Sequence, residues 1–443
     1  MKLFNICFKY SLRYSQVRHF LRTTPVSKNL CAARCLANLP PDDGNTGSGS
    51  LLGLRLLSTS SSSGKFSKHD LKKERQDDVV VTTTSDHIVI NENGISEKNV
   101  SGMWLRDHCR CQECFSETRY QNLYDPSKIE TKPTIAKLEK KGNSVHVDWN
   151  DGHSSVYTLD YLLSLLDNRP IRYPNRRLWN AEKLTSEIAD VSFQEYMNET
   201  EGLAKCLRNL YTYGIAFIDN VPLTKEDFLA LSERICFLRE CEHGRDNIVI
   251  SSKEKMYDDI AYTNHSLGFH TDSAYSVEPL GYLTFHLMEH TGEGGLGCYV
   301  DGFHVSEIIR KSNPDAYRIL SEVLVKQEFI DKHVHYKGNY PVFTIRDNEV
   351  KIIRYQTTDR ISVQHLSLEE TEQFYDGIRL FNKLIYSPEN EFWIKYNPGR
   401  VVIFDNFRLL HGRSMFTGTR VIRNTVLPRD EVDSRIRKLT GLG

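Results

Sequence analysis

Three residues, His270, Asp272 and His411, place the strongest constraint on how this chain folds. Side chains on a strand return to the same face every second residue, so a strand containing His270 and Asp272 directs an imidazole and a carboxylate to one side. An isolated His-x-Asp is common, and the distant His411, after the apolar run 401–404, makes the pattern more specific. Two histidines and one carboxylate suit Fe(II) that activates dioxygen. The pattern predicts that distant strands meet around an iron ion.

An iron centre of this kind needs a two-electron reductant, which in one large class is 2-oxoglutarate. The free carboxylate of 2-oxoglutarate needs a fixed cation, and arginine suits it best because its guanidinium can donate two parallel hydrogen bonds. Arg413, Arg420 and Arg423 all follow His411 at a reachable spacing. Arg420 and Arg423 are an odd number of residues apart, so on a strand they face opposite sides and only one is expected to point inward.

A second metal site is predicted from three closely spaced cysteines, Cys109, Cys111 and Cys114. Structural zinc prefers four tetrahedral sulfur or nitrogen ligands. The fourth ligand could be His108, His146 or His153, and His153 follows a predicted turn that could fold it back. Unliganded thiols are the alternative. The cluster lies far in sequence from the iron residues, so we expect a structural role.

The N-terminal segment has the composition of a mitochondrial transit peptide. It contains no Asp or Glu up to Pro41, whereas seven Lys or Arg residues are spread through it, and a serine-rich tract follows. We therefore expect residues 1–75 to be a transit peptide and linker directing the protein to the mitochondrial matrix, the alternative being a disordered tail. A matrix location argues against a disulfide framework for the ten cysteines.

Charge and hydropathy narrow the range of partners. The net charge of −1 gives no electrostatic case for binding nucleic acid or an anionic membrane. No run is long and apolar enough to span a bilayer. We expect the partners to be a small amino-acid-like substrate and dioxygen.

The remaining sequence divides into two predicted domains. Residues 76–168 contain alternating strand patterns and predict a small β-rich domain. In residues 178–443, helical spacing predicts helices over 193–213 and 225–238. Beyond residue 262, short apolar strands separated by glycine and proline turns favour a sandwich or jelly roll.

Several segments together resemble the carnitine-biosynthesis dioxygenases, the family of trimethyllysine and γ-butyrobetaine dioxygenases, from about residue 80 to the C-terminus. The segments that carry this resemblance are 103–109, 178–182, 213–217, 300–303, 389–393, 398–400 and 411–413. The resemblance implies a mainly β fold with flanking helices, in which a double-stranded β-helix lies behind a small zinc-binding β domain. It also implies a homodimer.

The same resemblance assigns roles to individual residues. It implies Fe(II) bound by His270, Asp272 and His411, and it selects Arg420 for 2-oxoglutarate, with Arg413 as a weaker candidate. It implies His153 as the fourth zinc ligand. Ascorbate is the expected reductant.

The implied reaction is hydroxylation of an aliphatic carbon, C3 of Nε-trimethyllysine, in carnitine biosynthesis. The alternatives are γ-butyrobetaine or an amine without a quaternary group, and, in a different class, a non-catalytic zinc-stabilised binding protein. The family holds its quaternary ammonium in an aromatic cage through cation–π attraction. Tyr262 matches one cage position, whereas His243, Asn247 and Val426 stand where the family has aromatic residues.

Overall fold

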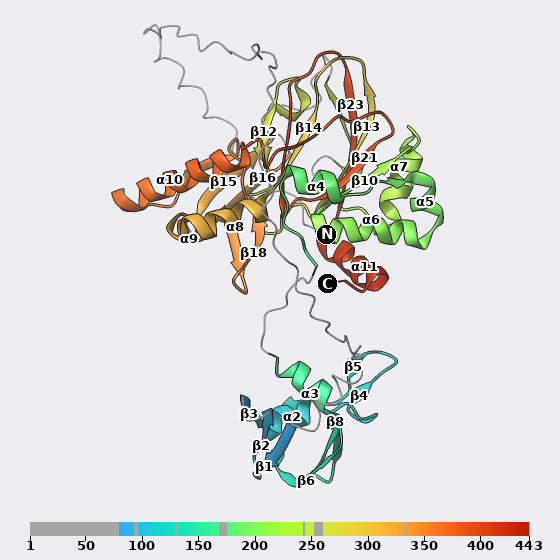
Figure 1. Cartoon of the computed structure of the whole chain (residues 1–443), viewed down its shortest axis with the longest axis vertical. Helices are drawn as coiled ribbons and strands as arrows, with labels where there is room; N and C mark the ends of the chain where they lie inside the picture. The colour runs from blue at the N-terminus through green and yellow to red at the C-terminus, as the bar shows by residue number, and fades with distance from the viewer. Residues whose placement is uncertain are drawn as a thin grey trace, which may run out of the picture. The chain divides into compact units, whose positions relative to one another are not determined.

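The computed structural model of the chain describes residues 79–92, 96–128, 132–167, 175–241, 244–251, 260–331 and 333–442 (Figure 1). The predicted transit peptide lies outside these residues, as does His243. Within the described part of the chain, no helix has both the length and the apolar character needed to cross a bilayer.

The N-terminal part is built from two small antiparallel sheets. One contains β1 (Val79–Thr83), β2 (His87–Glu92) and β3 (Ser96–Ser101), and the other contains β6 (Ile135–Lys141), β7 (Ser144–Trp149) and β8 (Ser154–Thr158). Alternate residues of these strands, among them Ile88, Ile90, Val145 and Val147, are buried in one apolar core. The predicted strand alternation is thus confirmed. Shorter elements complete this part: α2 (Gly102–Asp107), β4 (Phe115–Ser116), β5 (Gln121–Asn122), η1 (Pro126–Lys128) and α3 (Leu159–Leu165).

Two larger sheets form the centre of the C-terminal part. The first has the order β11 (Asn247–Ser251), β23 (Arg420–Leu427), β13 (Tyr282–His290), β21 (Val401–Asp405), β10 (Ile215–Asp219) and β9 (Val191–Ser192). The second has the order β12 (Leu267–His270), β22 (Leu409–Arg413), β14 (Gly297–Asp301) and β20 (Phe392–Ile394). Neighbouring strands that are far apart in sequence, such as β12 and β22, run antiparallel.

The two sheets face each other across a shared apolar layer. Leu283, Val402 and Phe404 of the first sheet belong to the same buried cluster as Tyr299 and Leu409 of the second. The rings of Phe404 and Tyr299 meet edge to face with centroids 5.1 Å apart. This confirms the predicted sandwich of short strands.

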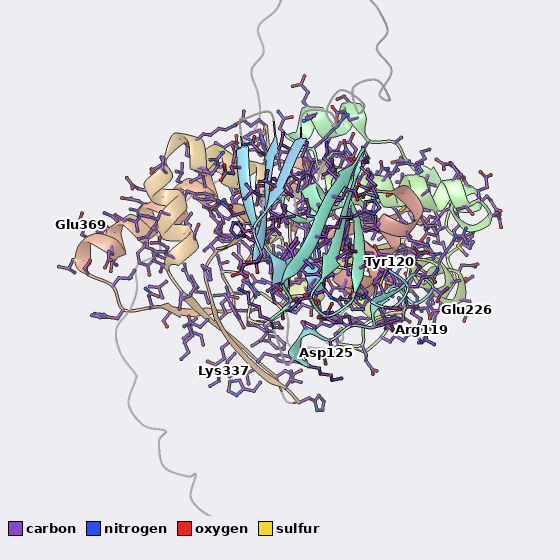
Figure 2. The ribbon with its side chains drawn as sticks, turned by 90° about the horizontal axis from the view of Figure 1, so that it is seen from below. Arg119, Tyr120, Asp125, Glu226, Lys337 and Glu369 are labelled. Carbon is purple, nitrogen blue, oxygen red and sulfur yellow. The ribbon has the colours of Figure 1, made fainter. Side chains whose placement is uncertain are left out.

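Helices cover the outer face of each sheet (Figure 1). On the first sheet lie α5 (Phe193–Asn198), α6 (Thr200–Tyr213), α7 (Lys225–Glu233) and α11 (Arg429–Thr440). On the second lie α8 (Gly302–Ser312), α9 (Pro314–Glu322) and α10 (Leu368–Ile385). In the same part of the chain, the side chains of Glu226, Lys337 and Glu369 lie at the periphery (Figure 2).

The predicted continuous helix over 193–213 was wrong at one point. Glu199 has extended backbone angles and separates α5 from α6. The two helices meet closely there, because a Cβ on Gly202 would lie 2.2 Å from the carbonyl oxygen of Glu195. The second predicted helix begins at Lys225, as expected, but ends at Glu233.

The remaining elements border the sandwich. They are α4 (Ala181–Glu187), η2 (Ile260–Tyr262), the sheet of β15 (Val325–Ile330), β16 (His335–Tyr340) and β19 (Arg360–Val363), and the hairpin of β17 (Phe343–Arg346) and β18 (Glu349–Ile353).

Candidate active site

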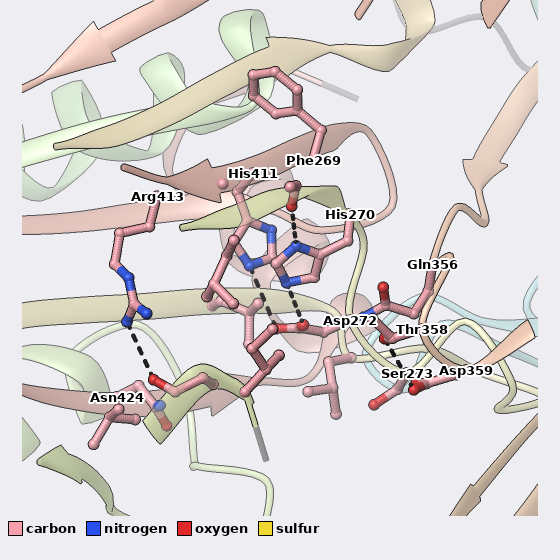
Figure 3. Close-up of a pocket in the computed structure, with 18 of the residues that line it drawn as sticks. Phe269, His270, Asp272, Ser273, Gln356, Thr358, Asp359, His411, Arg413 and Asn424 are labelled. Carbon is pink, nitrogen blue, oxygen red and sulfur yellow. Dashed lines mark hydrogen bonds and ion pairs between the residues drawn. The ribbon is translucent and has the colours of Figure 1, made fainter. Parts of the chain in front are cut away.

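His270, Asp272 and His411 converge at one end of the sandwich. His270 ends β12 and lies directly opposite His411 in the β12–β22 pairing. Their Nε2 atoms lie 3.3 Å (His270) and 3.6 Å (His411) from oxygens of Asp272. The three ligand atoms lie within 4.8 Å of one another, so a single ion could contact all three. Figure 3 shows both imidazoles directed at the carboxylate.

Asp272 does not lie on the strand that carries His270, contrary to the expectation from spacing. β12 ends at His270, and Asp272 lies in the turn that follows. Neighbouring contacts set its position: the Asp272 N–H donates to Oδ1 of Asn406, and Nδ2 of Asn406 donates to the Asp272 carbonyl. Between the two ligands, the Thr271 hydroxyl donates to the Ile353 carbonyl. The Asp272 carboxylate therefore approaches the histidines from a turn that these hydrogen bonds hold in place.

The protonation and orientation of the histidines suit metal binding. Nδ1 of His270 lies 2.8 Å from the carbonyl oxygen of Gly268, which orients Nε2 toward Asp272. Burial lowers the pKa of His411 to about 3; the nearby His270 adds to this effect and Asp272 opposes it. His411 is therefore neutral at physiological pH, and neutral imidazole is the form that binds a metal ion.

Arg420 points into the interior beside this cluster, and Arg423 points out, as their odd spacing predicts. Arg420 is 5% exposed and lines the same cavity as His270 and His411. Arg423 donates to Asp246 at 2.6 Å on the other face of β23. Among the described residues, Arg420 has no carboxylate partner and no hydrogen bond, and burial lowers its pKa. A buried guanidinium without an anion fits a site that receives a carboxylate.

Arg413 is also buried, but its guanidinium is already engaged. It donates to the backbone carbonyls of Ala261, Thr263 and His265, at 2.7–3.1 Å. These bonds hold the segment that carries Tyr262 against the cavity, and Figure 3 shows one of them. The arrangement gives Arg413 a positioning role for this segment, whereas Arg420 has no hydrogen-bond partner among the described residues.

A cavity of about 630 Å³ joins these groups. Its wall includes Tyr262, Asn247 and Val426. The hydroxyl of Tyr262 donates to Oδ1 of Asn247 at 3.1 Å. Val426 is buried nearby on β23.

Sequence reasoning missed several residues that shape this site. Asn406 lies in the turn between β21 and β22 and was passed over because a polar residue there is an ordinary turn signal. Arg354 donates to the carbonyls of Ala274, Ser276 and Val277, just after Asp272, and nothing in the sequence marks it. A polar residue directly after a buried strand was the one available signal for Asn406.

The cysteine cluster also forms in the structure. Nε2 of His153 lies 3.4–3.6 Å from the sulfur atoms of Cys109, Cys111 and Cys114. His108 instead stacks on Trp104 and contacts its carbonyl, and His146 contacts Ser144. Of the three histidines left open by the spacing, the fold brings only His153 to the cysteines among the described residues.

Comparison with known proteins identifies the class. Residues 172–426 match the family "Taurine catabolism dioxygenase TauD, TfdA family", and residues 79–163 match "Gamma-butyrobetaine hydroxylase-like, N-terminal". The chain therefore belongs to the TauD/TfdA family of dioxygenases, and it is a 2-oxoglutarate-dependent oxygenase.

Individual relatives narrow the family further. The chain is 36% identical to the mitochondrial trimethyllysine dioxygenase of Homo sapiens, over 76% of this chain and 82% of that protein. It is 28% identical to the γ-butyrobetaine dioxygenase of Pongo abelii, over 76% of this chain and 90% of that one. A taurine dioxygenase from Burkholderia xenovorans aligns with 57% of this chain and 91% of its own, at 14% identity and a TM-score of 0.43. Within its class, the chain is a member of the trimethyllysine and γ-butyrobetaine dioxygenase family.

Proposed function

We propose that this protein hydroxylates C3 of Nε-trimethyllysine in carnitine biosynthesis, using Fe(II), 2-oxoglutarate and dioxygen. The printed names of its relatives support the substrate. The observation that carries the proposal is the cavity in which His270, Asp272 and His411 face one another beside Arg420, a buried cation with no anionic partner among the described residues. A non-catalytic binding protein would have no use for this combination.

The residues of the chain have distinct roles in this proposal. His270, Asp272 and His411 hold Fe(II) through two nitrogens and one oxygen, which leaves coordination positions open. Arg420 binds the distal carboxylate of 2-oxoglutarate. Once bound, Fe(II) and 2-oxoglutarate supply the oxidising power that places an oxygen atom of dioxygen in a C–H bond, as 2-oxoglutarate becomes succinate and carbon dioxide. Phe285 and Leu283 form an apolar wall that keeps water from the reacting groups.

The substrate end of the cavity favours a second candidate. By the family resemblance, Asn247 and Val426 replace aromatic rings of the cage, and both line the cavity. The hydroxyl of the one matching ring, Tyr262, donates a hydrogen bond to Asn247. One ring gives a weaker cation–π site than several, by roughly 1 kcal/mol or more for each ring lost from a desolvated site. An amine without a quaternary group is therefore one alternative substrate. γ-Butyrobetaine, which keeps the quaternary group, is the other alternative, and the name of a matched relative supports it.

We also propose a structural zinc ion held by Cys109, Cys111, Cys114 and His153. The four ligand atoms lie within 4.8 Å of one another, as tetrahedral zinc requires. Two further contacts fit a metal site: Glu113 lies 3.5 Å from Nδ1 of His153, and Arg106 donates to Sγ of Cys114. A carboxylate on the second nitrogen orients a metal-bound imidazole.

The proposal also covers the domains, the cellular location, the reductant and the oligomeric state of the protein. The sandwich is a double-stranded β-helix within residues 178–443, and residues 76–168 are the zinc-binding domain. The relatives named as mitochondrial support a mitochondrial location, and the matrix, reached through a transit peptide in residues 1–75, follows from the presequence composition. Ascorbate keeps the iron reduced, and the protein forms a homodimer.

The proposal is tested by mass spectrometry of aerobic reactions containing Fe(II), ascorbate and 2-oxoglutarate. Trimethyllysine, γ-butyrobetaine and lysine are offered separately, and succinate is followed in each. Hydroxylated trimethyllysine supports the proposal, whereas succinate without that product rejects the substrate. Asp272→Ala should abolish turnover, and His333→Ala, at an exposed residue, serves as the control. No succinate from the wild type with any substrate would favour a non-catalytic protein.

A further inference from the structure

Two tyrosines that no part of the proposed function uses line the cavity close to Arg420. Tyr299 lies on β14, directly opposite His411 in the β14–β22 pairing, and Tyr396 follows β20. Both side chains are buried, and their hydroxyls form a hydrogen bond with each other. Both face the cavity rather than the outer, helix-covered side of the sheet. This polar pair therefore lies in the cavity wall, and Tyr299 lies beside a proposed iron ligand.

One of the two hydroxyl protons of this tyrosine pair has no acceptor among the described residues. Each hydroxyl has one proton to donate, and the single bond between Tyr299 and Tyr396 uses only one of the two. No other hydrogen bond to either hydroxyl occurs among the described residues. Buried hydroxyls normally have all their donors satisfied, because an unmet donor costs free energy. The second proton therefore points to an acceptor that enters from the cavity.

Arg420 supplies the matching charge at the same place. Its guanidinium has no anionic partner among the residues described, and both tyrosines lie close enough to raise its pKa against the lowering caused by burial. The two groups therefore offer several donors, and no acceptor of opposite charge, within one buried region. Such a set is complementary to a carboxylate, which can accept at both oxygens.

The local backbone is built to admit these side chains. A Cβ on Gly297 would lie 2.4 Å from Cε2 of Tyr396, and a Cβ on Gly295 would lie 3.2 Å from Nε of Arg420. Only glycine at residue 297 leaves space for the Tyr396 ring in this position. Glycines in and just before β14 thus leave room for the tyrosine and the arginine, which is consistent with a shaped ligand site.

We propose that the hydroxyls of Tyr299 and Tyr396 act with Arg420 as one receptor for the distal carboxylate of 2-oxoglutarate. One hydroxyl donates to the other, and the second donates its proton to the carboxylate that Arg420 binds. The pair is therefore a specificity determinant for a 2-oxo diacid over a 2-oxo monoacid of the same length. This inference rests on the proposed 2-oxoglutarate-dependent function.

The test compares two keto acids that differ only at the distal end. 2-Oxoglutarate and 2-oxopentanoate both chelate Fe(II) through the keto-acid end, but 2-oxopentanoate has no distal carboxylate. Each is titrated anaerobically into the Fe(II)-loaded full-length protein, and the visible absorption band of the chelate gives Kd without turnover. The variants are Tyr299→Phe, Tyr396→Phe and the double variant, which remove oxygen and keep the rings. Tyr196→Phe, a buried tyrosine bonded to the Leu231 carbonyl, is the matched control.

The double variant should bind 2-oxoglutarate about tenfold or more weakly, because a lost hydrogen bond to a charged group changes an equilibrium constant by that much. Its Kd for 2-oxopentanoate should stay within about twofold of wild type. Equal weakening of both keto acids, or none for 2-oxoglutarate, overturns the inference. If the double variant does not fold, the two single variants are held to the same comparison. A wild type that gives no band with either keto acid overturns the proposed function itself.

Discussion

Replacing Arg420 by methionine should make the ligand-free protein more stable while destroying its affinity for 2-oxoglutarate. Arg420 is almost fully buried and has no anionic partner among the described residues. Burying an unpaired ion costs several kcal/mol even after relaxation. Methionine avoids this cost but fills less space, and a void left in a packed core costs about 1–2 kcal/mol. The net expectation is a stabilisation of about 1–2 kcal/mol, or a rise in Tm of roughly 2–4 °C.

Bound 2-oxoglutarate should make the wild type more stable than Arg420→Met, the reverse of the ligand-free case. Breaking a buried pair by removing one partner costs about 3–5 kcal/mol, so the Kd for 2-oxoglutarate should rise more than about a hundredfold in Arg420→Met. At a concentration of about 100 times Kd, the ligand stabilises the wild type by about 2.7 kcal/mol, and the variant gains almost nothing. The assay is thermal unfolding of both proteins, anaerobic and Fe(II)-loaded, with and without 2-oxoglutarate.

Arg423→Met is a matched control on the same strand. Arg423 faces the opposite side and pairs with Asp246, which also contacts Lys225 at 3.2 Å. Its replacement should lower stability by about 1 kcal/mol and leave the response to 2-oxoglutarate unchanged. If Arg420→Met proved less stable than wild type without ligand, or kept the full ligand-induced shift, the reasoning about the unpaired guanidinium would be refuted.

Three further predictions follow from other parts of the structure. Cys111→Ser should lose the zinc ion and lower the thermal stability of the N-terminal part, and metal analysis that finds equal zinc in variant and wild type would contradict the site. Asn406→Asp should weaken Fe(II) binding at least about tenfold, since it replaces the amide that donates to the Asp272 carbonyl by a repelling oxygen; calorimetric Fe(II) titration would expose an unchanged affinity. Burial, aided by the charge of Arg423, lowers the pKa of His286 to about 4, so its folded-state pKa lies below the usual 6.5. Its contribution to stability is therefore present above pH 6.5 and is lost as pH falls from 6.5 toward 4. Between pH 7 and pH 5, His286→Leu should reduce that acid-induced loss by about 2 kcal/mol, and denaturant unfolding at these two pH values that shows the same loss in both proteins would refute it.

Local periodicity made much of the site predictable. The alternation of side chains on a strand predicted that only one of Arg420 and Arg423 points inward, and the structure has Arg420 inside and Arg423 outside. Close spacing alone brought three cysteines together. These features depend only on the repeat of the strand and on short chain segments, so the sequence contains all the information they need.

Contacts between distant segments could not be read in the same way. Residue spacing left three histidines open as partners of the cysteines. The family resemblance implied His153, and the fold brings His153 to the three cysteines. The sequence left the use of Arg413 open, and the structure commits it to three carbonyls. Tyr299 lies on β14 and Tyr396 follows β20, so nothing in either segment predicts their bond.

By itself, the sequence determined which chemical groups this protein has available: two histidines and a carboxylate that suit iron, arginines that suit an anion, and three closely spaced cysteines that suit zinc. The tertiary structure alone decided which polar groups are paired and which remain available, including the turn that carries Asp272 and the spare donors beside Arg420. The physical reason is that a residue type fixes what a side chain can donate or accept, whereas the register between strands fixes what it meets.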